Sequence, residues 1–276
     1  MAAKRILFIT QEMIPYVTES PQAVAGRKLP QAVQDAGREI RTFMPRWGII
    51  NERRNQLHEV IRLSGMNLII DDTDHPLIIK VASIPSARMQ VYFIDNEDYF
   101  SRKQMATDAK GKEYKDNPER AAFYARGVLE TVKKLRWVPD VIHCMGWMSS
   151  LVPLYIKTAY AEEPSFRDCR TVYTPSGMDM KAKLPKNIEG IIKYRSAGIE
   201  AMDGLEQTKD IQMLNKLGIK YADGVSIMEP TEAYTQLAQS LQKPLLEGAD
   251  LEGMGPRFSE FYDIVWDEAT PTPSGK

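Results

Sequence analysis

The sequence predicts an α/β fold, a Rossmann-like, doubly wound and mostly parallel sheet with helices on both faces. Short apolar runs alternate with segments of helical period, which is typical of βαβ units. The first run, residues 5–10, lacks polar alternation, as expected for a strand covered on both faces. At 276 residues, 43% hydrophobic and 26% charged, the chain has material for one large or two small domains.

The elements after this first strand follow in order. Residues 22–36 predict a helix that Gly37 closes, with Pro30 either kinking the helix or delaying its start. Residues 40–44 return as a strand, which ends at Pro45 because proline cannot donate to a sheet. Strand, helix and strand in this order predict a parallel pair.

A small β excursion follows at one edge of the sheet. Residues 66–70, 77–84 and 89–94 lack helix signals and are rich in apolar and β-branched residues, so they predict short strands. Residues 119–134 then predict a long helix, with Asn117 as its cap and a proline in the first turn.

The second half of the chain continues the alternation. In order it predicts a strand at 140–144, a helix at 147–161, a strand at 170–174, a loop-and-helix insertion at 181–209, a helix at 210–221, a strand at 224–227 and a helix at 230–242. Because Gly, Pro and acidic residues accumulate near the end, we expect one domain over residues 1–255 and a C-terminal tail over 256–276, with its end disordered.

Composition excludes several classes of protein. A net charge of −1 provides no field that would attract nucleic acid, so no nucleic-acid partner is expected. The apolar run at residues 6–9 is shorter than the roughly 7–15 residues of a signal-peptide core, and no run reaches the roughly 18 residues of a membrane span. Cys144 and Cys169 lack metal-binding or CxxC spacing, which favours reduced thiols in a cytoplasmic protein.

Residues 141–148 hold the most informative conflict in the chain. They read as a buried strand running into a helix, where an α/β enzyme places its reactive side chains. After His143, however, Met145, Gly146 and Met148 can neither move a proton nor hold a charge. The position is that of an active site, but its side chains are mostly inert.

Several colinear segments carry a resemblance to the N-terminal half of bacterial glycogen synthases and plant starch synthases. These segments are residues 6–15, 29–37, 44–49, 91–100, 114–130 and 217–231. The match spans residues 4–252 and implies the N-terminal-type half of a GT-B glycosyltransferase. Members of this family are retaining glucosyltransferases that use ADP-glucose.

The family's phosphate-binding motif is altered. Where relatives carry Lys-Thr-Gly-Gly-Leu-Gly-Asp, residues 18–24 read Thr-Glu-Ser-Pro-Gln-Ala-Val. The lysine is absent, Glu19 adds a carboxylate, and Pro21 removes an amide donor. A diphosphate would therefore meet repulsion where it needs charge neutralisation.

Two further motifs around the transferred glucose are also altered. The family's His-x-His-Asp-Trp-His keeps only His143 and Trp147, and its Thr-Ile-His-Asn becomes residues 174–177, which include Ser176 and Gly177. Losing one preorganised polar group typically lowers an enzyme's rate by about 10²–10³. Losing three motifs together predicts no useful turnover, even with strong non-additivity.

The resemblance nominates seven candidate residues of the former cleft, and no catalytic, cofactor-binding or metal-binding residue. They are Glu12, Tyr16, His143, Met145, Trp147, Ser176 and Gly177. Each also has an ordinary structural interpretation: His143 as a packing residue, Trp147 as a cover for the core and Glu12 as a partly solvated loop carboxylate.

Three hypotheses about function follow. The first is an inactive half-domain acting as a protein-binding, regulatory or scaffolding subunit, with a protein partner or a second copy of the chain over the former cleft. It rests on the altered motifs and on the absence of the family's C-terminal half. The second is an active glucosyltransferase completed by a separately encoded partner. The third is a module that binds glucan or a small phosphorylated ligand through Tyr16, Trp147 and residues 174–177.

Overall fold

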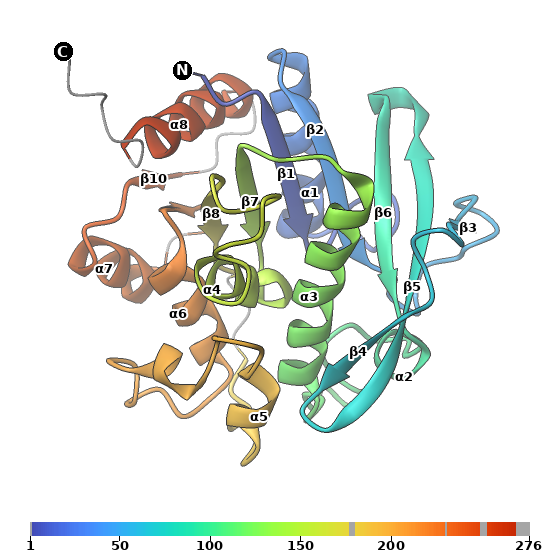
Figure 1. Cartoon of the computed structure of the whole chain (residues 1–276). Coiled ribbons are helices and arrows are strands. Elements are labelled where there is room, and N and C mark those ends of the chain that lie inside the picture. Colours follow the sequence, from blue (N-terminus) through green and yellow to red (C-terminus); the bar gives the residue numbers. More distant parts are fainter. Residues whose placement is uncertain (1, 177–179, 230, 249–252, 269–276) are drawn as a thin grey trace.

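The strands form one continuous, mostly parallel sheet. The computed structural model describes residues 2–176, 180–229, 231–248 and 253–268 (Figure 1). The strands are β1 (Arg5–Thr10), β2 (Glu39–Pro45), β3 (His58–Glu59), β4 (Met66–Ile70), β5 (Thr73–Ile84), β6 (Met89–Asp95), β7 (Val141–Met145), β8 (Arg170–Thr174), β9 (Gly224–Ile227) and β10 (Leu245–Glu247). Their order is β10-β9-β8-β7-β1-β2-β6-β5-β3, with β4 paired to β5.

The helices lie between these strands in sequence. The α-helices are α1 (Pro21–Asp35), α2 (Glu97–Phe100), α3 (Asn117–Leu135), α4 (Leu151–Lys157), α5 (Ile188–Ile192), α6 (Gln212–Tyr221), α7 (Glu232–Ser240) and α8 (Met254–Glu268). Short 3₁₀ turns are η1 (Pro85–Ala87), η2 (Trp147–Ser149) and η3 (Ile199–Met202).

The sheet confirms the predicted fold class. Strands β10 through β6 pair in parallel, whereas β5 pairs antiparallel with β6, β3 and β4, which is the expected β excursion at one edge. Strands β1, β8 and β9 have the bounds predicted from sequence. Parallel strands of this kind are easy to recognise because both faces are buried and the apolar run is unbroken.

Side chains alternate between two cores on opposite faces of the sheet. Along β1, Ile6 and Phe8 belong to the smaller core, which includes residues of α1 and α8. Leu7 and Ile9 belong to the larger core, which includes residues of α3, α4 and α6. Figure 1 shows these helices on the two sides of the sheet. The sheet is therefore doubly wound, as predicted.

Helix α1 begins with a strong local signal. The side chain of Ser20 accepts a hydrogen bond from the Ala23 amide, and Pro21 occupies the first turn. Pro30 lies inside the helix, and Gly37 follows it with a φ of +91°. Gly26 is required here, because a Cβ on it would lie 2.1 Å from the carbonyl oxygen of Glu12.

Two local predictions were wrong. The cap of α3 is Asp116, and Asn117 is instead the first helical residue, its side chain donating to the carbonyl of Ala106 at 2.9 Å. The helix predicted over residues 147–161 is shorter and divided into η2 and α4. The Asn117 side chain is used by a tertiary contact and not as a helix cap. A 3₁₀ turn, η2, takes the place of the first turn of the predicted second helix.

The predicted division at residue 255 falls inside α8. This helix packs against α1 and β8, and Phe258 and Tyr262 are buried in the smaller core. Arg38 donates to Asp263 at 2.8 Å, which ties the helix to the segment before β2. Residues 256–268 therefore belong to the fold, and residues 269–276 lie outside the described residues.

Two kinds of feature are absent from the described residues. No helix in these ranges is both long and apolar enough to cross a membrane. Nor do His, Cys, Asp and Glu side chains gather, within these same ranges, into a group of three that could hold a metal ion. Cys144 and Cys169 are both buried as free thiols.

Candidate functional site

A cavity of about 520 Å³, here called the strand-end cavity, lies at the carboxyl ends of the parallel strands. In the sheet, β1 lies between β2, the next strand along the chain, and β7, a much later one. The strand order therefore reverses at β1. Open α/β sheets bind their ligands at such a reversal, outside the carboxyl ends of the strands. Residues from the ends of β1, β7 and β8, the amino end of α1 and the segment after β9 line this cavity.

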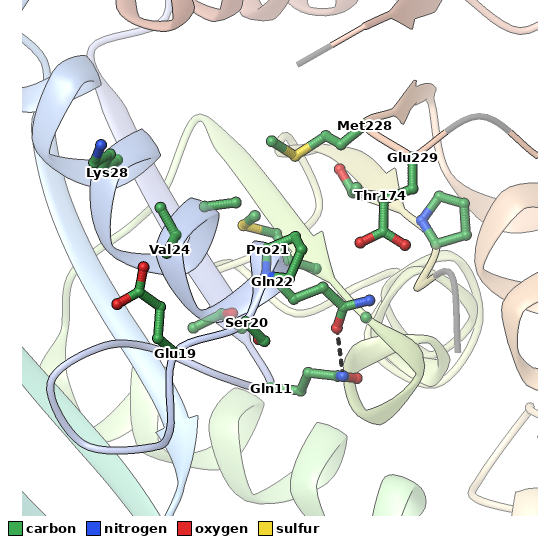
Figure 2. Close-up of a pocket in the computed structure, with 15 residues that line it drawn as sticks. Gln11, Glu19, Ser20, Pro21, Gln22, Val24, Lys28, Thr174, Met228 and Glu229 are labelled. Carbon is green, nitrogen blue, oxygen red and sulfur yellow. Dashed lines mark hydrogen bonds between the residues drawn. The ribbon is translucent and has the colours of Figure 1, made fainter. Parts of the chain in front are cut away.

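Much of the lining is apolar. Val24 and Ala25 come from α1, Met145 from the end of β7, Pro175 follows β8, and Met228 follows β9. Figure 2 shows Val24 and Met228 among the lining side chains, with Gln22 hydrogen-bonded to Gln11. Such a surface favours an apolar group over a charged one.

The amino end of α1 would be an anion site in most α/β proteins, but here the chain itself occupies it. Ser20 Oγ accepts from the Ala23 amide at 3.0 Å and donates to Glu12 Oε2 at 2.7 Å. Gln11 Nε2 donates to Glu12 Oε1 at 2.9 Å. Pro21 has no amide hydrogen to offer. Ser20 Oγ therefore takes the Ala23 amide that an external anion would use, and the Glu12 carboxylate holds Ser20 there.

The remaining charges of the cavity do not favour a polyanion. Among the described residues, Glu19 and Glu229 line it with a single lysine, Lys28, and Glu12 lies buried directly behind Ser20. At the rear, the Trp47 indole donates to the carbonyl of Gln11 at 2.6 Å and fixes the turn after β1. The site is thus rigid, with more carboxylates than ammonium groups.

His143 lies beneath the cavity and does not reach it. Both ring nitrogens have partners, Nδ1 the hydroxyl of Tyr262 and Nε2 the hydroxyl of Thr174, each at 2.7 Å. Thr174 is in turn hydrogen-bonded to Ser226. Burial lowers the pKa of His143 to about 3, so the imidazole is neutral near pH 7. The ring joins the sheet to α8, which agrees with its interpretation as a packing residue.

Other candidate residues belong to the larger core. Trp147 is 3% exposed and Met148 is fully buried, so residues 147–148 do not form an exposed apolar surface. Tyr16 packs edge-to-face on Phe93 with ring centroids 4.9 Å apart, and burial raises its pKa to about 12. Neither Trp147 nor Tyr16 lines the cavity. Trp147 is thus placed to cover the core rather than to stack on a sugar.

The structure separates the seven candidates. Met145 lines the strand-end cavity, Glu12 lies behind it and His143 beneath it. Ser176 is buried and lines a second hollow next to α6 and α7, and Gly177 lies outside the described residues.

Sequence reasoning missed several residues of this region. Gln11, Lys28 and Met228 line the cavity without having been singled out, and Tyr262 was assigned to the tail. One of the missed features had a usable signal: Ser20 followed by a proline is a common start of a helix.

Comparison with known proteins identifies the family. The model of the starch synthase catalytic domain matches residues 5–252. A glycogen synthase of Chlorobium phaeobacteroides is 34% identical over 252 residues, which cover 91% of this chain and 49% of that protein. A glycogen synthase of Chlorobaculum tepidum is 35% identical over 258 residues, covering 92% and 51%.

A solved structure shows the same fold. The catalytic domain of starch synthase IV from Arabidopsis thaliana, bound to ADP and acarbose, superposes with a TM-score of 0.67 at 16% identity. The match covers 91% of this chain and 52% of that one, and the chain spans about half the length of the two Chlorobi relatives. The resemblance proposed from the sequence is confirmed, and the chain belongs to the glycogen and starch synthase family, within its starch synthase catalytic domain.

Proposed function

We propose that this chain is a noncatalytic member of its family, a protein-binding, regulatory or scaffolding subunit of glycogen metabolism in the cytoplasm. One observation carries the proposal. At the amino end of α1, Ser20 Oγ already accepts from the Ala23 amide, and the buried Glu12 carboxylate is hydrogen-bonded to Ser20 directly behind it. A family activity that depends on a sugar diphosphate needs that position for phosphate.

Electrostatics explains why the cavity disfavours a diphosphate. The ligand would bring at least two negative charges next to Glu12 and Glu19, in a partly desolvated site where repulsion is only weakly screened. Lys28 is exposed and is the one cationic side chain in the described lining. Neutralisation by this half of the family fold is therefore incomplete.

The interior position of His143 supports the same conclusion. A group that handles the transferred sugar has to touch it, whereas this ring is fully buried and has both nitrogens engaged by Tyr262 and Thr174. Moving the ring into the cavity would leave two buried hydroxyl groups without their partner, which is costly.

The apolar lining favours a protein segment as the occupant of the strand-end cavity. Val24, Met145 and Met228 offer adaptable, uncharged surface of the kind that receives a leucine-like side chain. The segment comes from a protein partner or from a second copy of the chain. We expect its anchor to be aliphatic, because no aromatic ring lines the described cavity for stacking.

The first test is of donor binding and transfer. Calorimetry with ADP-glucose and with ADP is expected to show no binding up to millimolar concentration. Labelled glucose is expected not to enter glycogen when the chain is mixed with candidate partners, including separately produced C-terminal halves of family members. Micromolar ADP-specific binding, or transfer with any such half, would overturn the proposal in favour of an enzyme completed by its partner.

The second test is of the protein-binding surface. Val24→Asp places a charge in the cavity at a half-buried site, so association with a partner or with itself should weaken at least about tenfold. Val138→Asp is the matched control, because Val138 is 42% exposed and does not line the cavity. Sedimentation and titration with candidate partners measure both. Association that survives Val24→Asp, in a protein with an unchanged melting temperature, argues against this surface.

A further inference from the structure

A second hollow, of about 470 Å³, lies where α6 and α7 begin, next to the segment that follows β8. We call it the interhelix hollow. Figure 1 shows α6 and α7 as neighbours on one side of the molecule, and the two helices contact one another. Among the described residues, none lines both this hollow and the strand-end cavity. Its chemistry can therefore be considered by itself.

A fixed hydrogen-bond network forms one wall of the hollow. Asn215 donates to the hydroxyl of Tyr234 at 2.9 Å, and that hydroxyl donates to Gln212. The Asn215 carbonyl accepts from the hydroxyl of Tyr173 at 2.6 Å. Because Asn215 and Tyr234 are buried, these polar groups hold one orientation before any ligand arrives.

One buried polar group in the hollow lacks a partner. Ser176 is 2% exposed, and its Oγ makes no hydrogen bond to any described residue. Buried hydroxyl groups are nearly always paired, because an unpaired one loses its hydration without compensation. Ser176 lines the hollow, so a hydroxyl-bearing ligand could complete its hydrogen bonding.

The charges around the hollow favour an anion. Among the described residues, Lys181, Lys209 and Lys216 line it with one carboxylate, Asp210, whose Oδ1 accepts from the Gln212 amide at 3.0 Å. Lys216 Nζ donates to the hydroxyl of Thr208 at 2.6 Å. It forms no ion pair with a carboxylate in the described ranges. Even with Lys181 left out, two ammonium groups, those of Lys209 and Lys216, stand against one carboxylate in the described lining.

The amino end of α7 adds to this field. Thr231 is its cap residue, but the hydroxyl donates to the carbonyl of Glu229 at 3.2 Å instead of accepting from the helix. Thr231 and Ala233 line the hollow, so the positive end of the helix dipole faces it. A helix of nine residues with no side-chain cap is a site at which phosphate oxygens bind well.

We propose that the interhelix hollow binds a small molecule that carries both a phosphate group and hydroxyl groups. Lys216 and the amino end of α7 hold the phosphate, and Ser176 Oγ exchanges hydrogen bonds with a ligand hydroxyl. This site is additional to the proposed protein-binding role. It stands or falls independently of whether the strand-end cavity binds ADP-glucose.

The test is calorimetric titration of the full chain with three probes: glucose 6-phosphate, glucose and inorganic phosphate. Glucose 6-phosphate is expected to bind at least about tenfold more tightly than either of the others, since it alone satisfies both the lysines and Ser176. Absence of binding by glucose 6-phosphate at millimolar concentration overturns the proposal. Equal affinity for glucose 6-phosphate and inorganic phosphate overturns the assignment of Ser176 to a ligand hydroxyl.

Three variants locate the site. Lys216→Gln should weaken glucose 6-phosphate binding by roughly tenfold, and Ser176→Ala by roughly threefold to tenfold. Lys110→Gln, on an exposed turn that does not line the hollow, is the matched control and should change nothing. Each variant is first shown to melt like the parent protein. An equal loss in Lys110→Gln and Lys216→Gln would mean that overall charge alone attracts the probe, which contradicts a defined site.

Ser176→Ala also separates a ligand contact from a structural role. If the hydroxyl only supports the fold, its removal changes the melting temperature and leaves binding intact, and the proposal fails for this residue. If it contacts the ligand, affinity falls with unchanged stability, because no internal hydrogen bond of the described structure is lost. The same titration at several salt concentrations gives a further test. If Lys216 contacts the phosphate, affinity for glucose 6-phosphate falls as ionic strength rises. Affinity that is independent of salt contradicts this contact.

Discussion

The strand-end cavity and the interhelix hollow have similar volumes, about 520 and 470 Å³, but opposite chemistry. In the first, the polar groups bond to one another through Glu12, Ser20 and Gln11, and the rest of the lining is largely apolar. In the second, the Ser176 hydroxyl lacks a hydrogen-bond partner and Lys216 lacks a carboxylate within the described residues. Position in an α/β fold favours the first as a ligand site, but the available hydrogen-bonding groups favour the second.

The two regions differ in which polar groups are already engaged within the fold. The turn after β1 and the start of α1 remain well formed, because Ser20 caps the helix and Gly26 allows close packing on Glu12. What changed is which groups remain available to a ligand. A helix start whose amide is already capped cannot also bind an external phosphate at that amide.

The largest expected effect concerns Trp147, which we place in the core rather than in either cavity. Trp147→Ala should lower the free energy of unfolding by about 3–5 kcal/mol, because a fully packed indole is replaced by a void. Denaturant unfolding measures it. The control is Ile61→Ala, at 83% exposure, which should have almost no effect. A small loss at Trp147, together with weakened glycogen binding, would restore the sugar-stacking role and break the comparison.

The next effect concerns His143 and pH. Its pKa of about 3 in the fold lies below the unfolded value of about 6.5, so the neutral ring stabilises the protein fully above pH 6.5. That contribution is lost as pH falls from 6.5 toward 3, by about 1.4 kcal/mol per pH unit. The difference in unfolding free energy between the parent protein and His143→Gln should therefore shrink by about 2 kcal/mol between pH 6.5 and 5. Parallel pH profiles of the two proteins would contradict a buried neutral imidazole.

The smallest effect would sharpen the comparison by making the two cavities more alike. Glu19→Lys replaces a carboxylate of the strand-end cavity with a cation, so affinity for pyrophosphate should rise by about tenfold. Glu59→Lys is the control for net charge, because Glu59 is exposed and does not line the cavity. Calorimetry of both variants gives the result. If Glu19→Lys gains no affinity beyond that of Glu59→Lys, local charge is not what keeps the cavity free of phosphate.

Much of the fold could be predicted from sequence, but not all of it. β1 and β8 were predicted to the residue because their apolar runs are unbroken and their ends are polar. α8 was missed because Gly and Pro precede it and the acidic end of the chain resembles a tail, although Phe258 and Tyr262 carry its buried face. Asn117 was taken for a cap, whereas its amide is used by a distant loop carbonyl.

The candidate site was predictable in position and unpredictable in detail. Met145 was nominated for the former cleft, and it lines the strand-end cavity beside the end of β1. The hydrogen bond from Ser20 to Glu12 behind the start of α1 could not be foreseen, because the two residues are eight positions apart and the bond depends on the side-chain orientation of Ser20. Sequence patterns report period and composition, and they do not report which polar groups pair with one another.

The sequence alone determined the kind and order of most elements, the α/β class and the family resemblance, because these depend on local periodicity and on motifs contiguous in the chain. Only the tertiary structure decided what each site residue does. His143 is an internal bridge because Tyr262, 119 residues away, reaches it from α8. The unpaired state of Ser176 likewise depends on α6 and α7, which lie beside it in space but not in sequence. Burial and hydrogen-bond partners are properties of packing, and packing joins residues that the sequence holds apart.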